Sequence, residues 1–235
     1  MLSGKEIRRW VFGAYFIEDL CDKFGPAYPG LARRLYWSVL PEMAAKGLIF
    51  IHVPRAGGTS VAQALFNGRS PGHHSIRAYR SLAPDLYRTA QSFAVMRDPM
   101  DRFRSSYAFV RQGGGDVVPL TRIFRQQTAH IRSVDDYLDF IEDRQAFDLD
   151  FVMRAQSWFI CDLVTKAPLV KRIFLLGRDD AELDAFLVRH GAHGRLPRVN
   201  RAERPDILLT RAQRDRIERL YADDFDLYDD LLAQR

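Results

Sequence analysis

Three short apolar runs mark the chain, over residues 48–53, 93–96 and 170–176. The first is rich in β-branched residues and too short for a helix, which is typical of a strand buried on both faces of a parallel sheet. The other two have the same character. Each run gives way to a proline, an arginine or a glycine, after which a turn and a helix follow. The pattern predicts an α/β fold with a mostly parallel sheet, and we expect a second strand close to residues 73–79.

Helix signals follow the apolar runs. Apolar residues recur at helical spacing after the paired glycines, and a proline favours the first helical position further along. Glycines at 113–115 break the second of these helices. Helices are therefore predicted to begin after Gly58, near Pro99, at Ser133 and at Thr210, the last in a capping box completed by Gln213 and running to residues 220–221.

Residues 1–46 precede these elements and also have helical character. Ser3 and Glu6 have the spacing of a capping box, and Trp10 to Leu20 follow in partial helical register. A second helix is predicted over 31–40. The aromatic residues of this segment favour packing on the core, with attachment to a membrane surface or a dimer contact as alternatives.

Composition fits one globular α/β domain. The 235 residues are enough for one such domain and few for two, and 47% of them are hydrophobic and 28% charged. We therefore predict a single domain over 1–235, with a helical segment at 1–46 and a catalytic core at 47–235. The net charge of +5 suits an anionic ligand without requiring nucleic acid, which we do not expect as a partner.

The cysteine content indicates a reducing compartment, and the hydropathy predicts no membrane span. Cys21 and Cys161 are too few for a disulfide framework. The most apolar N-terminal stretch, residues 10–17, is too short to cross a bilayer and lacks the cleavage site of a signal peptide. We expect a cytoplasmic protein without a membrane span, whose residues 1–46 are the place for any peripheral membrane contact. Oligomeric state cannot be predicted.

The first strand leads into a loop suited to an anion. Residues 54–60 read Pro-Arg-Ala-Gly-Gly-Thr-Ser, so glycines bring the backbone close to a ligand just where a helix begins with unpaired N–H groups. A nucleoside-triphosphate loop would end in Gly-Lys-Ser/Thr, whereas Gly58 is followed by Thr59 and the only cation is Arg55. The loop predicts a phosphate-like ligand other than a conventional triphosphate.

A second motif follows the strand that ends at Met96. It places Arg97, Pro99, Arg102, Ser105 and Tyr107 at fixed spacing. Together with the loop it resembles the sulfotransferases that use 3′-phosphoadenosine-5′-phosphosulfate (PAPS). The resemblance implies that Arg97 and Ser105 bind the 3′-phosphate, and that the 5′-phosphosulfate is held by Pro54, Arg55, Ala56, Gly57, Gly58, Thr59 and Ser60. An ion pair between Arg97 and Asp98 is the alternative.

Transfer to a hydroxyl needs a base, and two histidines are candidates. Asp85 is the only carboxylate between Arg55 and Arg97, which leaves His73 and His74. A Gly-His-x-Ser-like run in the resembling family favours His74 over His73. The alternative is that both are solvated loop histidines.

Later elements extend the resemblance over about residues 48–230. They include Gln156 with Trp158, a strand closing in Gly177-Arg178, Leu-Pro-x-x-Asn at 196–200, and a tail over 221–228 whose Phe225 and Leu227 we expect to close the core. Arg178 either lines the nucleotide site or pairs with Asp179 or Asp180. The arginines between 111 and 132 either shape an acceptor pocket or form a solvated face.

The resemblance is to the carbohydrate sulfotransferases, of heparan and chondroitin type, Golgi-like and bacterial. It implies a three-layer α/β/α fold like that of P-loop nucleoside-triphosphate hydrolases, with PAPS as donor, PAP as product, a carbohydrate or glycoconjugate hydroxyl as acceptor, and no metal. Arg55 stands where the family usually has lysine, so it can stabilise charge but cannot deliver a proton. The alternatives are a non-catalytic module that binds PAP or another anion, and a small-molecule kinase.

Overall fold

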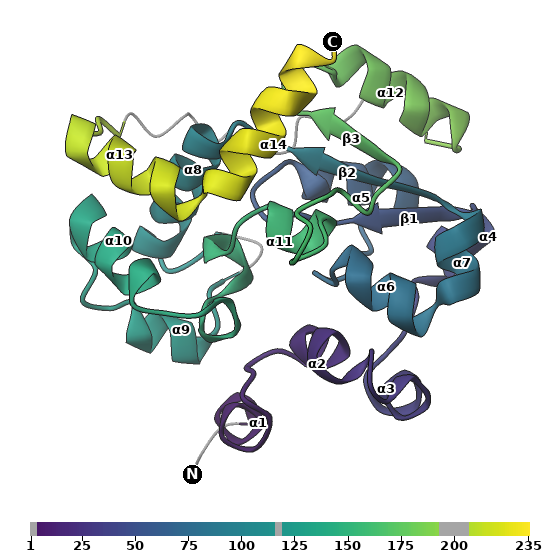
Figure 1. Cartoon of the computed structure of the whole chain (residues 1–235), viewed down its shortest axis with the longest axis horizontal. Coiled ribbons are helices and arrows are strands. Elements are labelled where there is room, and N and C mark those ends of the chain that lie inside the picture. Colours follow the sequence, from purple (N-terminus) through teal and green to yellow (C-terminus); the bar gives the residue numbers. More distant parts are fainter. Residues whose placement is uncertain (1–3, 116–118, 193–206) are drawn as a thin grey trace. The chain divides into compact units, whose positions relative to one another are not determined.

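The computed structural model describes residues 4–115, 119–192 and 207–235 of a mixed α/β protein (Figure 1). The chain divides into two compact units, residues 1–97 with 156–200 and residues 98–155 with 201–235, which are described separately below. The single domain over 1–235 stays a prediction.

A three-stranded parallel sheet organises the first unit. Its strands are β1 (Leu48–Ile51), β2 (Gln91–Met96) and β3 (Arg172–Leu175), in the order β1-β2-β3. Leu48 lies opposite Gln91, and Phe93 lies opposite Arg172. The three runs predicted as strands are confirmed. They are nearly continuous in apolar residues because the strands are buried along almost their whole length.

Aromatic rings form the core around the sheet. Phe50 and Phe93 stack across β1 and β2 with ring centroids 5.0 Å apart. Phe186 of α12 (Asp180–Arg189) lies 4.8 Å from Phe93 and 5.3 Å from Phe174. Three strands and one helix thereby share a single aromatic cluster, which holds the carboxyl ends of the strands in a fixed arrangement.

The other helices of the first unit confirm some predictions and correct others. Their bounds are α1 Gly4–Phe12, α2 Ile17–Phe24, α3 Pro29–Leu35, α4 Pro41–Ala45, α5 Gly58–Phe66, α6 Ile76–Leu82, α7 Pro84–Thr89 and α11 Ser157–Ile160. The helix expected after the glycines is α5. The strand expected near 73–79 is wrong, because Ser75 caps α6 by accepting a hydrogen bond from the Ala78 amide, and the next strand is β2.

The N-terminal helices are shorter than predicted. Gly13 adopts φ +66° and separates α1 from α2, so residues 10–20 do not form one helix. The helix expected over 31–40 starts earlier and ends at Leu35, and a separate short helix begins at Pro41. In the described part of the chain, no helix is long and apolar enough to cross a membrane. Cys21 and Cys161 are both buried free thiols.

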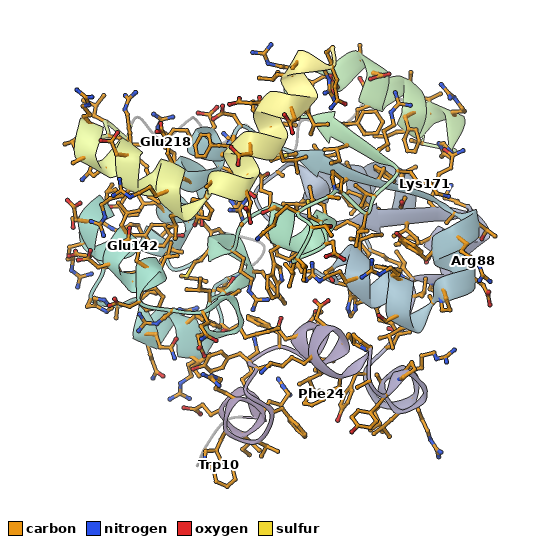
Figure 2. All side chains as sticks on the ribbon, viewed as in Figure 1. Trp10, Phe24, Arg88, Glu142, Lys171 and Glu218 are labelled. Carbon is orange, nitrogen blue, oxygen red and sulfur yellow. The ribbon has the colours of Figure 1, made fainter. Side chains whose placement is uncertain are left out.

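Side chains join the end of α7 to the start of β3. Figure 2 labels Arg88 and Lys171 in this region. The Lys171 ammonium donates to the carbonyl oxygens of Ala90, at 2.6 Å, and of Arg88, at 3.0 Å. This contact ties the segment before β2 to the segment before β3 and fixes where the two strands begin.

The second unit is helical. It contains α8 Pro99–Arg111, α9 Arg122–Gln127, α10 Val134–Glu142, α13 Arg211–Leu220, α14 Ala222–Ala233 and two short 3₁₀ helices at Ala146–Asp148 and Phe151–Met153. The predicted starts at Pro99, Ser133 and Thr210 are confirmed, the last two as capping boxes with Asp136 and Gln213. In the tail, Leu227 is buried as expected, whereas Phe225 is only half-buried. The 196–200 element lies outside the described residues.

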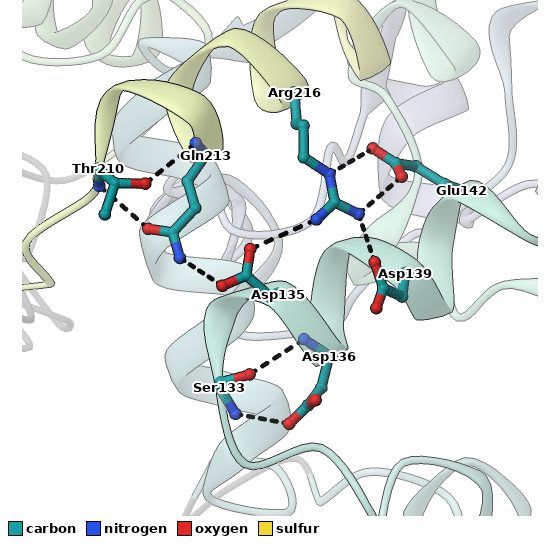
Figure 3. Close-up of polar contacts among 8 residues, drawn as sticks. All are labelled: Ser133, Asp135, Asp136, Asp139, Glu142, Thr210, Gln213 and Arg216. Carbon is teal, nitrogen blue, oxygen red and sulfur yellow. Dashed lines mark hydrogen bonds and ion pairs between the residues drawn. The ribbon is translucent and has the colours of Figure 1, made fainter.

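One arginine joins α10 and α13 (Figure 3). Arg216 forms ion pairs with Asp135 at 3.3 Å, with Glu142 at 2.7 Å, and with Asp139. These carboxylates recur at helical spacing along one face of α10. Hydrogen bonds to Glu142 and Asp139 raise the pKa of Arg216, so its guanidinium is charged at pH 7.

Candidate anion-binding site

A tight turn follows β1 and leads directly into α5. The Val53 amide donates to the Ile51 carbonyl at 3.1 Å, and the Ala56 amide donates to the Val53 carbonyl at 3.4 Å. Arg55 and Gly57 both adopt left-handed backbone conformations, with φ +65° and +84°. Such a conformation is uncommon for arginine and marks a residue held in place by its surroundings. The turn brings the first amides of α5 to the end of the strand.

Close contacts fix the two glycines of this turn. A Cβ on Gly57 would lie 3.2 Å from the Leu176 side chain, which follows β3. A Cβ on Gly58 would lie only 2.0 Å from the ring of His52. Packing against His52 therefore requires a glycine at position 58, and the left-handed backbone favours one at position 57. Pro54 and Ala56 are buried, Thr59 is exposed and Ser60 is half-buried.

Arg97 stands at the carboxyl end of β2, where Gln156 holds its backbone. The Gln156 side chain accepts a hydrogen bond from the Arg97 amide at 3.0 Å and donates one to the Arg97 carbonyl at 2.8 Å. Gln156 itself is fully buried. A side-chain amide here replaces a neighbouring strand, so the backbone of Arg97 keeps the extended geometry of β2 beyond its last sheet partner.

Aspartates stabilise the turns that follow β2 and β3. Asp98 caps α8 by accepting from the Asp101 amide. Asp179 and Asp180 accept from the amides of Leu175 and Gly177, each at 2.7 Å. Their carboxylates therefore bond backbone groups, while the ion-pair alternatives for Arg97 and Arg178 stay untested. Arg178 is exposed.

The parallel sheet brings three arginines to one edge. Arg55, Arg97 and Arg178 each follow the carboxyl end of a strand, and the three strands are adjacent and parallel. The carboxyl ends of parallel strands lie at the same edge, where ligands of open α/β sheets bind. Arg55, Arg97 and Arg178 therefore lie along the edge of the sheet at which α5 begins, and cationic residues beside a helix N-terminus are suited to an anion.

Two histidines lie beside the end of β1. The His73 Nδ1 is 2.9 Å from the His52 carbonyl oxygen, and the two rings are 4.7 Å apart. A carbonyl can only accept, so Nδ1 of His73 carries the proton and a neutral ring presents Nε2 as a proton acceptor. The His52 Nδ1 lies 3.2 Å from the hydroxyl of Ser70.

His74 has different neighbours. Its ring meets Trp37 edge to face at 4.8 Å and lies 6.3 Å from Tyr79. Its Nδ1 is buried and has no hydrogen-bond partner among the described residues. Burial lowers the pKa of His74, and the carboxylate of Glu18 opposes that shift. His74 therefore packs against Trp37 and Tyr79, whereas His73 lies beside the end of β1, and the prediction that favoured His74 stays untested.

His52 is a site residue that the sequence did not reveal. Burial, and then the charge of His73, hold the pKa of His52 well below its usual range, so the ring is neutral at pH 7. The residue supports Gly58 with its ring and His73 with its carbonyl. Its position as the one polar residue within the first apolar run was the available signal.

The second motif divides between the two units. Arg97 belongs to the first unit, whereas Ser105 lies on α8 in the second unit and is 6% exposed. Arg102 is a core residue of the second unit, 1% exposed, and donates to the Val152 carbonyl at 3.2 Å. The next hydroxyl, that of Ser106, lies 2.6 Å from the hydroxyl of Tyr137. The binding of one phosphate by both Arg97 and Ser105 stays a prediction.

No family model matches the chain, and a search of curated proteins found no match. Among the described residues, no group of three or more histidine, cysteine, aspartate or glutamate side chains is placed to hold a metal ion. The chemistry of the site therefore has to be inferred from its own geometry.

Proposed function

We propose that this chain is a PAPS-dependent sulfotransferase that transfers a sulfonate group to a hydroxyl, most simply that of a carbohydrate or glycoconjugate. One observation carries the proposal: a glycine-shaped turn at the N-terminus of α5 shares a sheet edge with Arg97, whose backbone is held by Gln156. The loop lacks the lysine of a triphosphate site. The proposal includes the three-layer P-loop-like fold of which the parallel sheet would form the centre.

The anionic ends of the donor are assigned to different residues. In this proposal the amides of residues 57–60 and the guanidinium of Arg55 hold the 5′ end, and Arg97 with Ser105 holds the 3′-phosphate. Arg178 lines the nucleotide. PAPS, when bound, supplies the electrophilic sulfur and a bisphosphate leaving group. Guanidinium groups suit this ligand because they form paired hydrogen bonds to phosphate oxygens.

His73 is the proposed base. Its Nδ1–H is committed to the His52 carbonyl, so Nε2 is the atom that takes the proton of an acceptor hydroxyl. Arg55 and the loop amides stabilise the negative charge that develops on the departing oxygen. Arg55 remains charged throughout, so the leaving group departs without a proton from this side chain.

Calorimetric titration with PAP, AMP and ATP tests the donor assignment. We expect PAP to bind at least about tenfold more tightly than AMP, because each charged hydrogen bond to the 3′-phosphate is worth about 1.5–3 kcal/mol. Arg97→Ala should remove that preference, while Arg88→Ala, at an exposed arginine of the same unit, should retain it. Equal binding of PAP and AMP to the unmodified chain would refute the proposal.

Turnover with labelled PAPS and a panel of hydroxyl acceptors tests the base. His73→Ala should lower turnover by about 10²–10⁴ and leave PAP affinity unchanged. His74→Ala should retain turnover in correctly folded protein. The reverse result would assign the base to His74, as the family resemblance favoured.

A non-catalytic PAP-binding module is the second candidate. The observation in its favour is Arg55 at the position where the resembling family has lysine. PAP binding with the expected preference but no transfer to any acceptor class would favour this module.

The two free cysteines fit a reducing compartment, and on that basis we propose a cytoplasmic location.

A further inference from the structure

Helix α1 exposes apolar side chains to solvent and keeps its charged side chains half-buried, the reverse of an ordinary surface helix. Its apolar residues Ile7, Trp10 and Val11, called here the inverted face, are exposed by 49%, 85% and 51%, whereas Phe12 packs edge to face on Phe24 with ring centroids 6.0 Å apart. Its charged residues between Lys5 and Arg9 are all half-buried, and the helix has no buried residue. A surface helix in water normally turns its apolar side chains inward, so α1 is arranged for an apolar environment outside the protein.

Charged groups attach α1 to the turn that follows it. The Arg8 guanidinium donates to the Tyr15 carbonyl at 3.3 Å, and Arg9 lies 5.9 Å from the centre of the Tyr15 ring. The ammonium of Lys5 lies 4.5 Å from the centre of the Phe16 ring. These contacts hold the polar side of the helix against the protein and leave the inverted face outward. Figure 2 shows Trp10 directed away from the ribbon.

Helix α3 repeats this composition, whereas α2 carries three acidic residues and one lysine. Of the twelve large apolar residues exposed in the described part of the chain, eight lie between residues 7 and 35. On α3, Leu31 and Leu35 are 57% and 55% exposed at helical spacing, with the exposed Arg33 and Arg34 between them. Single exposed apolar residues are ordinary, but a concentration on helices that also carry cations indicates a binding surface.

We propose that the inverted face of α1 docks the protein onto an anionic lipid surface. Helix α1 has a net positive charge, and α3 adds the exposed Arg33 and Arg34 beside its exposed leucines, so the charge of this segment is complementary to such a surface. Short amphipathic helices with tryptophan on one face and arginine or lysine beside it lie in the interface of a bilayer. A groove of about 450 Å³ lined by Glu6, Arg9, Trp10 and Tyr15 opens beside the exposed indole.

A second copy of the chain fits this face less well. A symmetric dimer brings the same surface of both copies together and would place the exposed Arg33 and Arg34 of both copies in one interface. A helix of this length is also only about 14 Å long and about 10 Å wide. That footprint is far below the roughly 800 Å² per partner of a stable interface.

Flotation of the full chain with lipid vesicles tests the proposal. Vesicles of phosphatidylcholine mixed with phosphatidylserine should capture the protein, and vesicles of phosphatidylcholine alone should capture much less. Trp10→Ala should weaken capture about tenfold. Leu208→Ala, at a residue of matched 88% exposure outside this segment, should leave it unchanged. Arg34→Ala should weaken capture about fivefold, whereas Arg219→Ala should not.

Tryptophan fluorescence tests the binding of vesicles by a second method that does not depend on flotation. The tryptophan emission should shift to shorter wavelength on addition of the anionic vesicles, and Trp10→Ala should abolish the shift although Trp37 and Trp158 remain. PAP affinity should be the same in both proteins, so the result is separate from the proposed function. Three results would each overturn the proposal. They are equal capture with and without phosphatidylserine, unchanged capture of Trp10→Ala, and self-association without lipid that depends on Trp10.

Discussion

Gln156 is the side chain on which the position of Arg97 depends. It is fully buried and bonds both polar groups of the Arg97 backbone. A buried backbone group that loses its partner costs about 1–3 kcal/mol. Gln156→Ala should therefore lower the free energy of unfolding in urea by about 2 kcal/mol and weaken PAP binding. Gln145→Ala, at an exposed glutamine, is the control, and equal stability of the two variants would contradict the assignment.

His74 should make stability depend on pH. Burial lowers its pKa, so the unfolded chain takes up a proton at a higher pH than the folded chain does. Stability from this group is complete above its usual pKa of about 6.5 and is lost as the pH falls below that value.

The measurement is urea unfolding between pH 7.5 and 5.5. His74→Phe keeps a flat ring against Trp37 and cannot be protonated, so its stability should fall less with decreasing pH than that of the unmodified chain. His130→Gln, at an exposed histidine, should keep the original slope. A slope unchanged by His74→Phe would mean that Glu18 compensates the burial completely.

At the scale of elements, the junction of β1 and α5 depends on Gly58. A Cβ there would meet the His52 ring at 2.0 Å, whereas a Cβ on Gly30 would meet nothing within 4 Å. Gly58→Ala should therefore cost about 1–3 kcal/mol of stability by overpacking, and it should reduce PAP binding. Gly30→Ala should change neither quantity. Thermal unfolding and calorimetry of the two variants test this, and indistinguishable results would show that His52 moves freely.

The contact of α10 and α13 depends on Arg216. Its three carboxylate partners are exposed by 57%, 66% and 39%, so solvent screens each ion pair. We expect Arg216→Gln to cost about 1 kcal/mol, and less at high salt. Arg219→Gln on the same helix is the control. A loss that does not change with salt concentration would indicate packing of the arginine stem as the main contribution.

The predictable elements were those with a local cause. The strands were predicted because their apolar runs are continuous, and the starts of α10 and α13 because their capping residues are adjacent in sequence. Helix α6 was not predicted, because a strand was expected near residues 73–79 and Ser75 was not identified as the residue that caps a helix. The bond from Gln156 to Arg97 joins residues far apart in the chain, and no local pattern reports such a contact. The choice between His73 and His74 likewise depends on tertiary neighbours.

At the scale of the whole molecule, the connection between the units predicts cooperative unfolding. The chain leaves the first unit after Arg97 and returns at Gln156, and the bond between these two residues couples both ends of the intervening segment to the end of β2. We expect one thermal transition for the full chain. Gln156→Ala in the first unit and Arg216→Gln in the second should both shift that transition. Two separate transitions, each sensitive to one variant, would contradict the predicted single domain.

The two hydrogen bonds between Gln156 and the Arg97 backbone also have a consequence for evolution. Residues 98–155 leave the first unit after Arg97 and return to it at Gln156, so they are an inserted part of the chain whose ends meet at one hydrogen-bonded point, and they form the second unit together with residues 201–235. A segment whose ends meet can lengthen, shorten or be exchanged while the strands on either side keep their places. Selection could therefore remodel this inserted part, and with it whatever it binds, without rebuilding the sheet edge that carries the arginines.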